Sequence, residues 1–163
     1  MKKKIFKLLA MVFTLLMVVG CSQEKDKSEI ESLVGYIYIE NNILYVDEVE
    51  IVTLDDIDRI EELDLTIQND LPSGYSIYNS NIEKEAYDLT DETVYKFVDM
   101  NLLFVDDEDG DRIYTTIKID EFLKHLDEYN LNDIPLSQQK IPYFIEVQNG
   151  KIIKIEEKFE YTI

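Results

Sequence analysis

The stretch that decides the fold is Pro142–Tyr161, PYFIEVQNGKIIKIEEKFEY. Its centre, Asn149-Gly150, is the strongest short signal for a hairpin with a type I′ turn, because both residues tolerate a positive φ. Residues alternate on each side of the turn, as in strands with one buried face. The sequence therefore predicts antiparallel strands over 142–148 and 151–161. In the second strand the buried face is expected to carry Ile153, Ile155, Phe159 and Tyr161, and the wet face Lys154, Glu156, Lys158 and Glu160.

A second hairpin is predicted where the folded body begins. Residues 33–39 alternate between two faces, and a further alternating run, Ile43–Ile51, follows the turn residues Asn41-Asn42. Leu71–Gly74 (LPSG) is a predicted turn. Other strand-like segments are 75–78, 93–100, 102–105 and 112–118.

Two short helices complete the predicted elements. Thr53 is expected to cap a helix over 54–63, with Asp56 completing a capping-box-like pair. Asp120 is expected to cap a second helix that ends at Tyr129. Together these elements predict one α+β domain over 33–163, mainly antiparallel, in which a small curled sheet or OB-like barrel carries two short helices.

The first 20 residues have the parts of a signal peptide. Lysines at positions 2, 3, 4 and 7 precede 12 uncharged residues, Leu8–Val19. A membrane-spanning helix needs about 20 apolar residues, so this shorter run fits a cleaved hydrophobic region. The run ends in Val18-Val19-Gly20-Cys21, which resembles the lipobox of bacterial lipoproteins. The resemblance implies cleavage between Gly20 and Cys21 and a diacylglycerol thioether on Cys21.

Cys21 is the only cysteine in the chain, so an internal disulfide is excluded. A single acyl chain gives only marginal membrane binding, whereas the two chains of a diacylglycerol are enough for stable anchoring. Residues 21–32 are polar and lack aromatic side chains, which predicts a disordered tether after the lipidated cysteine. The expected location is the extracytoplasmic face of the cell membrane, with the lipid as the anchor.

The charge restricts the choice of partner. The chain holds 35 acidic and 16 basic residues; removal of the first 20 residues takes away four lysines and leaves a net charge of −23. Such a surface repels phosphate backbones, which argues against nucleic acid. Solubility and repulsion from an anionic envelope explain the charge most simply, and attraction of a cationic partner or a divalent metal is the alternative.

The acidic turn Asp106–Asp111 (DDEDGD) is the best candidate metal site. Asp107, Asp109 and Asp111 are spaced like the first ligands of a calcium loop. An EF-hand also needs Gly at the sixth position and Glu at the twelfth, which here are Arg112 and Lys118. A solvated hairpin turn is therefore the main interpretation, with weak calcium binding as the alternative.

No catalytic signature stands out. His125 is the only histidine and is expected to pack at the edge of the second helix's apolar stripe. Zinc sites built from several His or Cys ligands are excluded, and so are Cys–His nucleophiles. With 35 acidic residues, pairs of carboxylates occur by chance, so a carboxylate-dependent hydrolase is the weakest alternative. Five tyrosines at strand positions predict either cross-strand packing or an aromatic binding face: Tyr36, Tyr38, Tyr45, Tyr75 and Tyr78.

Residues 49–79, which include DRIEEL (58–63) and LPSGYSIYN (71–79), are similar to uncharacterised lipoproteins of low-GC Gram-positive bacteria. This resemblance supports the fold and the location and implies no activity. The predicted function is a non-enzymatic, lipid-anchored module that binds an unknown protein or small ligand without a cofactor. A calcium- or cation-responsive module that uses Asp107, Asp109 and Asp111 is the first alternative.

Overall fold

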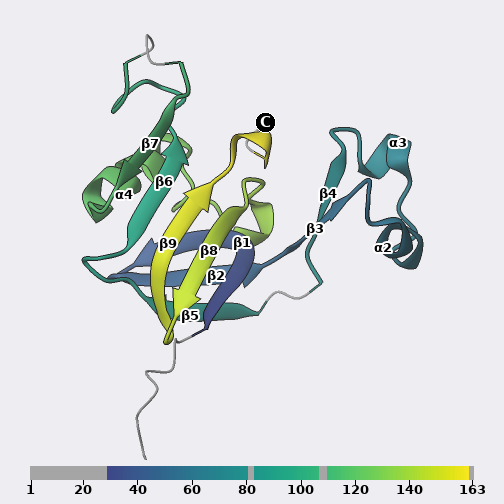
Figure 1. Cartoon of the computed structure of the whole chain (residues 1–163), viewed down its shortest axis with the longest axis horizontal. Coiled ribbons are helices and arrows are strands. Elements are labelled where there is room, and N and C mark those ends of the chain that lie inside the picture. Colours follow the sequence, from purple (N-terminus) through teal and green to yellow (C-terminus); the bar gives the residue numbers. More distant parts are fainter. Residues whose placement is uncertain (1–28, 81–82, 107–109, 162–163) are drawn as a thin grey trace, which may run out of the picture.

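A computed structural model describes residues 29–80, 83–106 and 110–161 of the chain. Figure 1 shows the order of its elements. The strands are β1 (Ile30–Glu40), β2 (Ile43–Glu48), β3 (Glu50–Thr53), β4 (Tyr75–Tyr78), β5 (Lys84–Asp88), β6 (Val94–Val98), β7 (Ile113–Thr116), β8 (Tyr143–Gln148) and β9 (Lys151–Glu157). The helices are α2 (Ile57–Glu62), α3 (Ile67–Asp70) and α4 (Ile119–Glu128), with 3-10 turns η2 (Leu136–Gln138) and η3 (Phe159–Tyr161).

Seven strands form one curled sheet in the order β5-β2-β1-β8-β9-β6-β7. β5 also meets β9 through one residue pair, Asp88 and Lys151, so that five of the strands make a barrel-like ring (Figure 1). Neighbouring strands are antiparallel except where β9 meets β5 and β6. The predicted α+β fold with a curled, mainly antiparallel sheet is confirmed.

Both predicted hairpins are present. Asn41 and Asn42 join β1 to β2 with φ angles of 52° and 61°. Asn149 and Gly150 join β8 to β9 with φ angles of 54° and 72°. Positive φ at both central residues is what a type I′ turn requires. Asn and Gly at these positions therefore account for the tight connections.

The sheet begins earlier than expected. Residues 30–32, predicted to end the tether, form the start of β1 because Ile30 pairs with Gln148 on β8. The earlier tether residues, up to 28, lie outside the described part of the chain.

The predicted faces of the last strand are wrong in part. The pairing of β8 with β9 shifts register between Glu146 and Val147, which skips Ile153. After this bulge the buried side chains are Ile155 and Glu157. β9 ends at Glu157, and the residues that follow form η3 instead of continuing the strand. The bulge changes the alternation because one extra residue rotates the strand.

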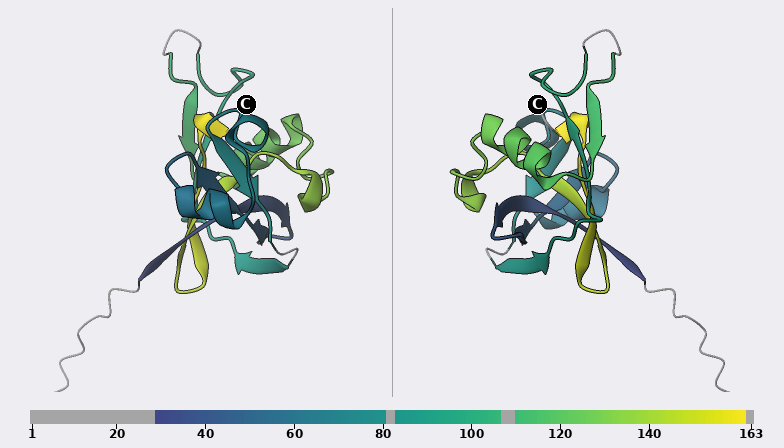
Figure 2. Two further views of the ribbon diagram at one scale, coloured as in Figure 1. Left: turned by 90° about the vertical axis from the view of Figure 1, so that its right-hand side faces the viewer. Right: turned by 90° about the vertical axis from the view of Figure 1, so that its left-hand side faces the viewer.

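The main core lies inside the curled sheet and is closed on one flank by α4. Figure 2 shows α4 and the segment after it on the same flank. The ring of Phe122 on α4 stacks on that of Tyr95 at 4.7 Å, and Leu126 is fully buried. The helix runs from Ile119, two residues earlier than predicted, with Lys118 at the N-cap in place of Asp120.

Residues 50–78 form a lobe beside the sheet, made of the β3–β4 ribbon, α2 and α3 (Figure 1). Its small core holds Val52, Ile60 and Leu71. The predicted helix over 54–63 is shorter, since Thr53 does not cap it. Instead, the N–H and hydroxyl of Thr53 donate to the carboxylate of Asp56, at 2.8 and 2.7 Å. These bonds close a turn between β3 and α2.

Candidate functional site

The residues of the predicted calcium site are only partly described. Asp107 and Asp109 lie outside the described residues. The Asp111 carboxylate is exposed and accepts the backbone N–H of Ile113 at 3.0 Å, which is a local turn contact. Within the described ranges no group of three His, Cys, Asp or Glu is arranged to hold a metal. The calcium hypothesis stays a prediction, as does lipidation of Cys21 after Gly20, since both residues are undescribed.

The candidate tyrosines pack against different neighbours. Tyr36 is buried in a small cluster between β1, η2 and β4. Tyr38 stacks on Tyr45 with ring centroids 4.5 Å apart. Tyr75 meets Tyr161 edge to face at 4.8 Å, and Tyr78 lies in the lobe under the guanidinium of Arg59. Each of the five rings therefore has an intramolecular contact, and an aromatic binding face stays a prediction.

The structure brings together three charged or titratable side chains that were not predicted as a site: Asp99, His125 and Glu157, named here the buried charge cluster. The side chains of His125 and Glu157 are 4% and 0% exposed, and Nε2 of His125 lies 3.1 Å from Oε2 of Glu157. The same carboxylate accepts the backbone N–H of Val98 at 2.9 Å. β9 thereby holds β6 and α4 at one end of the sheet.

Aromatic rings enclose this pair. The imidazole of His125 stacks on Phe97 at 4.1 Å, and its Nε2 is 3.4 Å from the hydroxyl of Tyr143. Burial, followed by the nearby charge of Glu157, raises the pKa of Tyr129 to about 12 and that of Tyr143 well above its ordinary value. Both phenols therefore remain neutral at physiological pH.

Two polar atoms beside His125 lack a hydrogen-bond partner among the described residues. They are Oε1 of Glu157 and the hydroxyl of Tyr129. Buried atoms of this kind are costly, since each loses its hydration without replacement. The cluster is closed to solvent, and its carboxylates accept hydrogen bonds from neighbouring backbone N–H groups.

Asp99 supports the loop that follows β6. Its carboxylate, on a residue 2% exposed, accepts the backbone N–H groups of residues 103, 104 and 105 at 2.7–2.9 Å. Burial raises the pKa of Asp99, but these three bonds and the proximity of His125 outweigh it, and the net pKa is lowered. Residues 102–105, predicted as a strand, form an irregular loop because Asp99 takes their N–H groups.

The sequence predicted that His125 packs at the edge of the helix's apolar stripe, but it did not predict the proximity of Glu157 and Asp99. A usable signal was present at Glu157, which occupies a position that strict alternation assigns to the apolar face of the last strand. A charged residue at a core position requires a buried partner. His125 was the only histidine available to pair with it.

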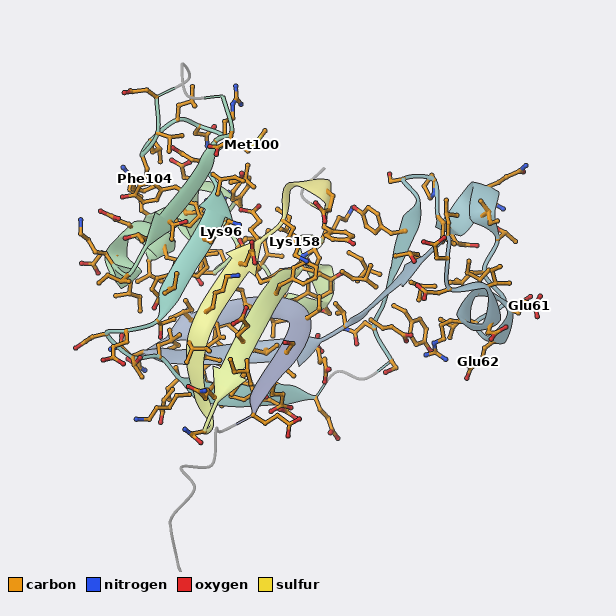
Figure 3. The ribbon with its side chains drawn as sticks, viewed as in Figure 1. Glu61, Glu62, Lys96, Met100, Phe104 and Lys158 are labelled. Carbon is orange, nitrogen blue, oxygen red and sulfur yellow. The ribbon has the colours of Figure 1, made fainter. Side chains whose placement is uncertain are left out.

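Above the cluster lies the β7 edge, defined as β7, its flanking Ile117 and the loop 100–105. β7 is the last strand of the sheet and pairs only with β6. Figure 3 shows Met100 and Phe104 at this end of the molecule. Five large apolar side chains here are 37–60% exposed: Met100, Leu102, Leu103, Ile113 and Ile117. The edge therefore combines a strand that is paired on one side only with solvent-exposed apolar groups.

An acidic hollow of about 350 Å³ lies elsewhere, where β2 passes into β3 near the start of β5. Its lining is Glu48, Val49, Glu50, Ser80, Glu83 and Glu85. Glu50 is already paired with Arg59 at 2.7 Å, which neutralises part of its charge.

Comparison of the chain with protein-family models, curated proteins and solved structures found no significant match. None of the helices in the described ranges has the length and apolar character needed to cross a bilayer.

Proposed function

We propose that the chain is a lipid-anchored, extracytoplasmic, non-enzymatic module that binds a partner protein through the β7 edge. The anchor rests on the lipobox-like Val18-Val19-Gly20-Cys21 after a charged and then apolar segment. The binding role rests on one observation, the exposed apolar side chains on and beside an edge strand of the sheet. Exposed apolar groups that gather on one surface mark interaction sites.

The position of the β7 edge supports this role. β1 starts next to the β8–β9 turn, because Ile30 pairs with Gln148. β9 runs from that turn to the other end of the sheet, where β6 lies alongside it and Val98 pairs with Ile113 (Figure 1). A seven-residue strand spans about 23 Å. A chain tethered before β1 thus holds the start of β7 away from the membrane.

The anchor is tested by fractionation and lipid labelling of cells. Wild-type protein is expected in the membrane fraction and labelled by a fatty-acid probe. Cys21→Ala protein is expected to remain unlabelled and unprocessed, and Ser22→Ala is the matched control. Processing and lipid labelling of Cys21→Ala at the wild-type level would contradict the anchor.

The binding role is tested by photo-crosslinking in intact cells. A photoreactive amino acid at Ile117, which is 60% exposed, is expected to give one discrete protein adduct. The same amino acid at Asn149, exposed in the β8–β9 turn next to the start of β1, is the control and is expected to give none. Equal adducts at both positions, or none at Ile117, would exclude the β7 edge as the binding surface.

A further inference from the structure

The backbone of β7 has an open side. Asp99 donates its N–H to the carbonyl of Arg112 at 2.7 Å, which starts the ladder between β6 and β7. In an antiparallel ladder the backbone groups of successive residues point to opposite sides. The N–H and C=O groups of residues 113 and 115 therefore point away from β6.

One of these outward groups is already occupied. The Asp111 carboxylate accepts the N–H of Ile113. The N–H and C=O of Thr115 have no backbone or side-chain partner within the described part of the chain. Thr115 is also exposed. The edge thus offers a donor and an acceptor at its centre.

β7 is short, at four residues, but it lacks the other features that usually protect an edge strand. Native sheets block open edges with Pro, Lys, bulges or covering segments. The strand sequence Ile113–Thr116 is IYTT, with neither Pro nor charge, and its pairing with β6 runs without a register shift. Ile113 stands on the same face as Thr115 and is 40% exposed, and Ile117, which directly follows the strand, is 60% exposed. An added strand would find apolar contacts on that face.

The charge around β7 favours a cationic occupant. The described residues between 99 and 121 include five acidic side chains and two basic ones, Arg112 and Lys118, a net charge of −3. Pairing two copies through β7 would bring two such segments together, and like charges at contact range oppose that association. A segment with Lys or Arg beside its strand residues is attracted instead.

We infer that β7 binds an extended, positively charged segment of the partner as an eighth strand of the sheet. This inference rests on the proposed function and adds the chemistry of the occupant. Main-chain bonds to Thr115 provide the pairing, and Ile113 and Ile117 select apolar residues at alternate positions of the segment. The acidic residues flanking β7 select its cationic ends.

The test uses the full chain in non-ionic detergent and the acetylated peptide KKTVTVTVKK. Hydrogen exchange is expected to slow at residues 113–117 when the peptide is added, and binding is expected to weaken at least tenfold in Thr115→Pro. Proline removes an outward N–H and leaves the ladder to β6 intact. Thr115→Ser, which keeps the N–H, is the matched control and is expected to bind within twofold of wild type.

Two peptide controls make the result independent of protein folding. The same peptide N-methylated at its six central residues keeps side chains and charge but cannot pair, and is expected to lose binding. A peptide with Glu in place of each Lys is expected to bind at least tenfold more weakly. Equal binding of the methylated peptide, protection away from β7, or dimerisation through β7 would overturn the inference. A discrete adduct at Ile117 without peptide binding would overturn strand addition and leave the proposed function standing.

Discussion

Glu157 is a carboxylate residue whose side chain is fully buried. One carboxylate oxygen holds both the N–H of Val98 and Nε2 of His125, and the other has no partner within the described ranges. Through these contacts the carboxylate joins β9, β6 and α4. Removing one member of a buried pair leaves the other unpaired, which is strongly destabilising.

We therefore expect Glu157→Ala to lower the free energy of unfolding by about 3 kcal/mol. The cause is the loss of acceptors for Val98 and His125 at one buried point. Urea unfolding followed by circular dichroism measures the change. Glu160→Ala, at an exposed position three residues on, is the control and should stay within about 0.5 kcal/mol of wild type. Similar effects for the two variants would show that the buried pair is not structural.

Asp99 gives a prediction that depends on pH. Its folded-state pKa lies below the ordinary value of 3.8, so its charged form stabilises the fold above about pH 4. That contribution is lost as the pH falls through the folded-state pKa. Asp99→Asn is expected to cost about 2 kcal/mol at pH 7, because an amide replaces one acceptor oxygen for three backbone N–H groups.

The measurement is urea unfolding of wild type and Asp99→Asn between pH 7 and pH 3. The difference between the two proteins should be constant at neutral pH and shrink below pH 4. Exposed Asp106→Asn is the matched control and should show no such convergence. A difference that grows on acidification would contradict a carboxylate stabilised in its charged form.

At the scale of elements, β1 is the long strand that connects β8 and β2 within the sheet. Its first half pairs with β8 and its second half with β2, and Gly35 is the one residue paired on both sides. A Cβ built on Gly35 would lie 2.5 Å from Cγ1 of Val46 and 2.7 Å from the carbonyl oxygen of Asp47. The second of these contacts is with backbone, which cannot rotate away.

Gly35→Ala is accordingly expected to destabilise the protein by about 3 kcal/mol through overpacking where the strand changes partners. Thermal unfolding measures the effect, and Ser32→Ala on the exposed part of the same strand is the control. A Gly35→Ala protein as stable as wild type would mean that β1 and β2 can separate at this point without cost.

The elements show which features local sequence determines. Turn residues with positive φ, such as Asn149 and Gly150, correctly predicted both hairpins, because that signal depends only on neighbours in the chain. The bulge at Ile153 was not predictable, since it arises from the register with β8. Gln139 shows the same limit at longer range. Its side-chain amide bonds both the N–H and the C=O of Ile37, 102 residues away, where β8 has left β1.

The candidate sites also differ in whether local sequence or distant contacts determine them. The acidic turn was predicted as a metal site because the spacing of its aspartates is a local feature of the sequence. The buried charge cluster comes from three distant segments, and no local pattern joins Asp99, His125 and Glu157. The β7 edge became visible only with the strand order, because a sequence does not say which strand is last in a sheet.

At the scale of the whole molecule, the described residues form one main core and two smaller buried clusters, one of which lies in the lobe. The curled sheet and α4 bury a large cluster of aromatic and aliphatic side chains. The lobe relies on Val52, Ile60 and Leu71, supported by partly buried neighbours. Stability within a protein follows buried apolar contact, so segments with few such contacts open at lower free energy. The lobe should therefore open while the sheet remains folded.

We expect native-state hydrogen exchange to show this difference. Amides in α2 and β4 should exchange with an opening free energy below that of β8 and β9. Ile60→Ala should lower the lobe value further, by about 2 kcal/mol, and leave the sheet value unchanged. Ile155→Ala, in the main core, should lower both, because the lobe cannot remain closed when the sheet unfolds. If Ile60→Ala instead lowered the protection of β8 and β9 equally, the lobe and the sheet would form one cooperative unit.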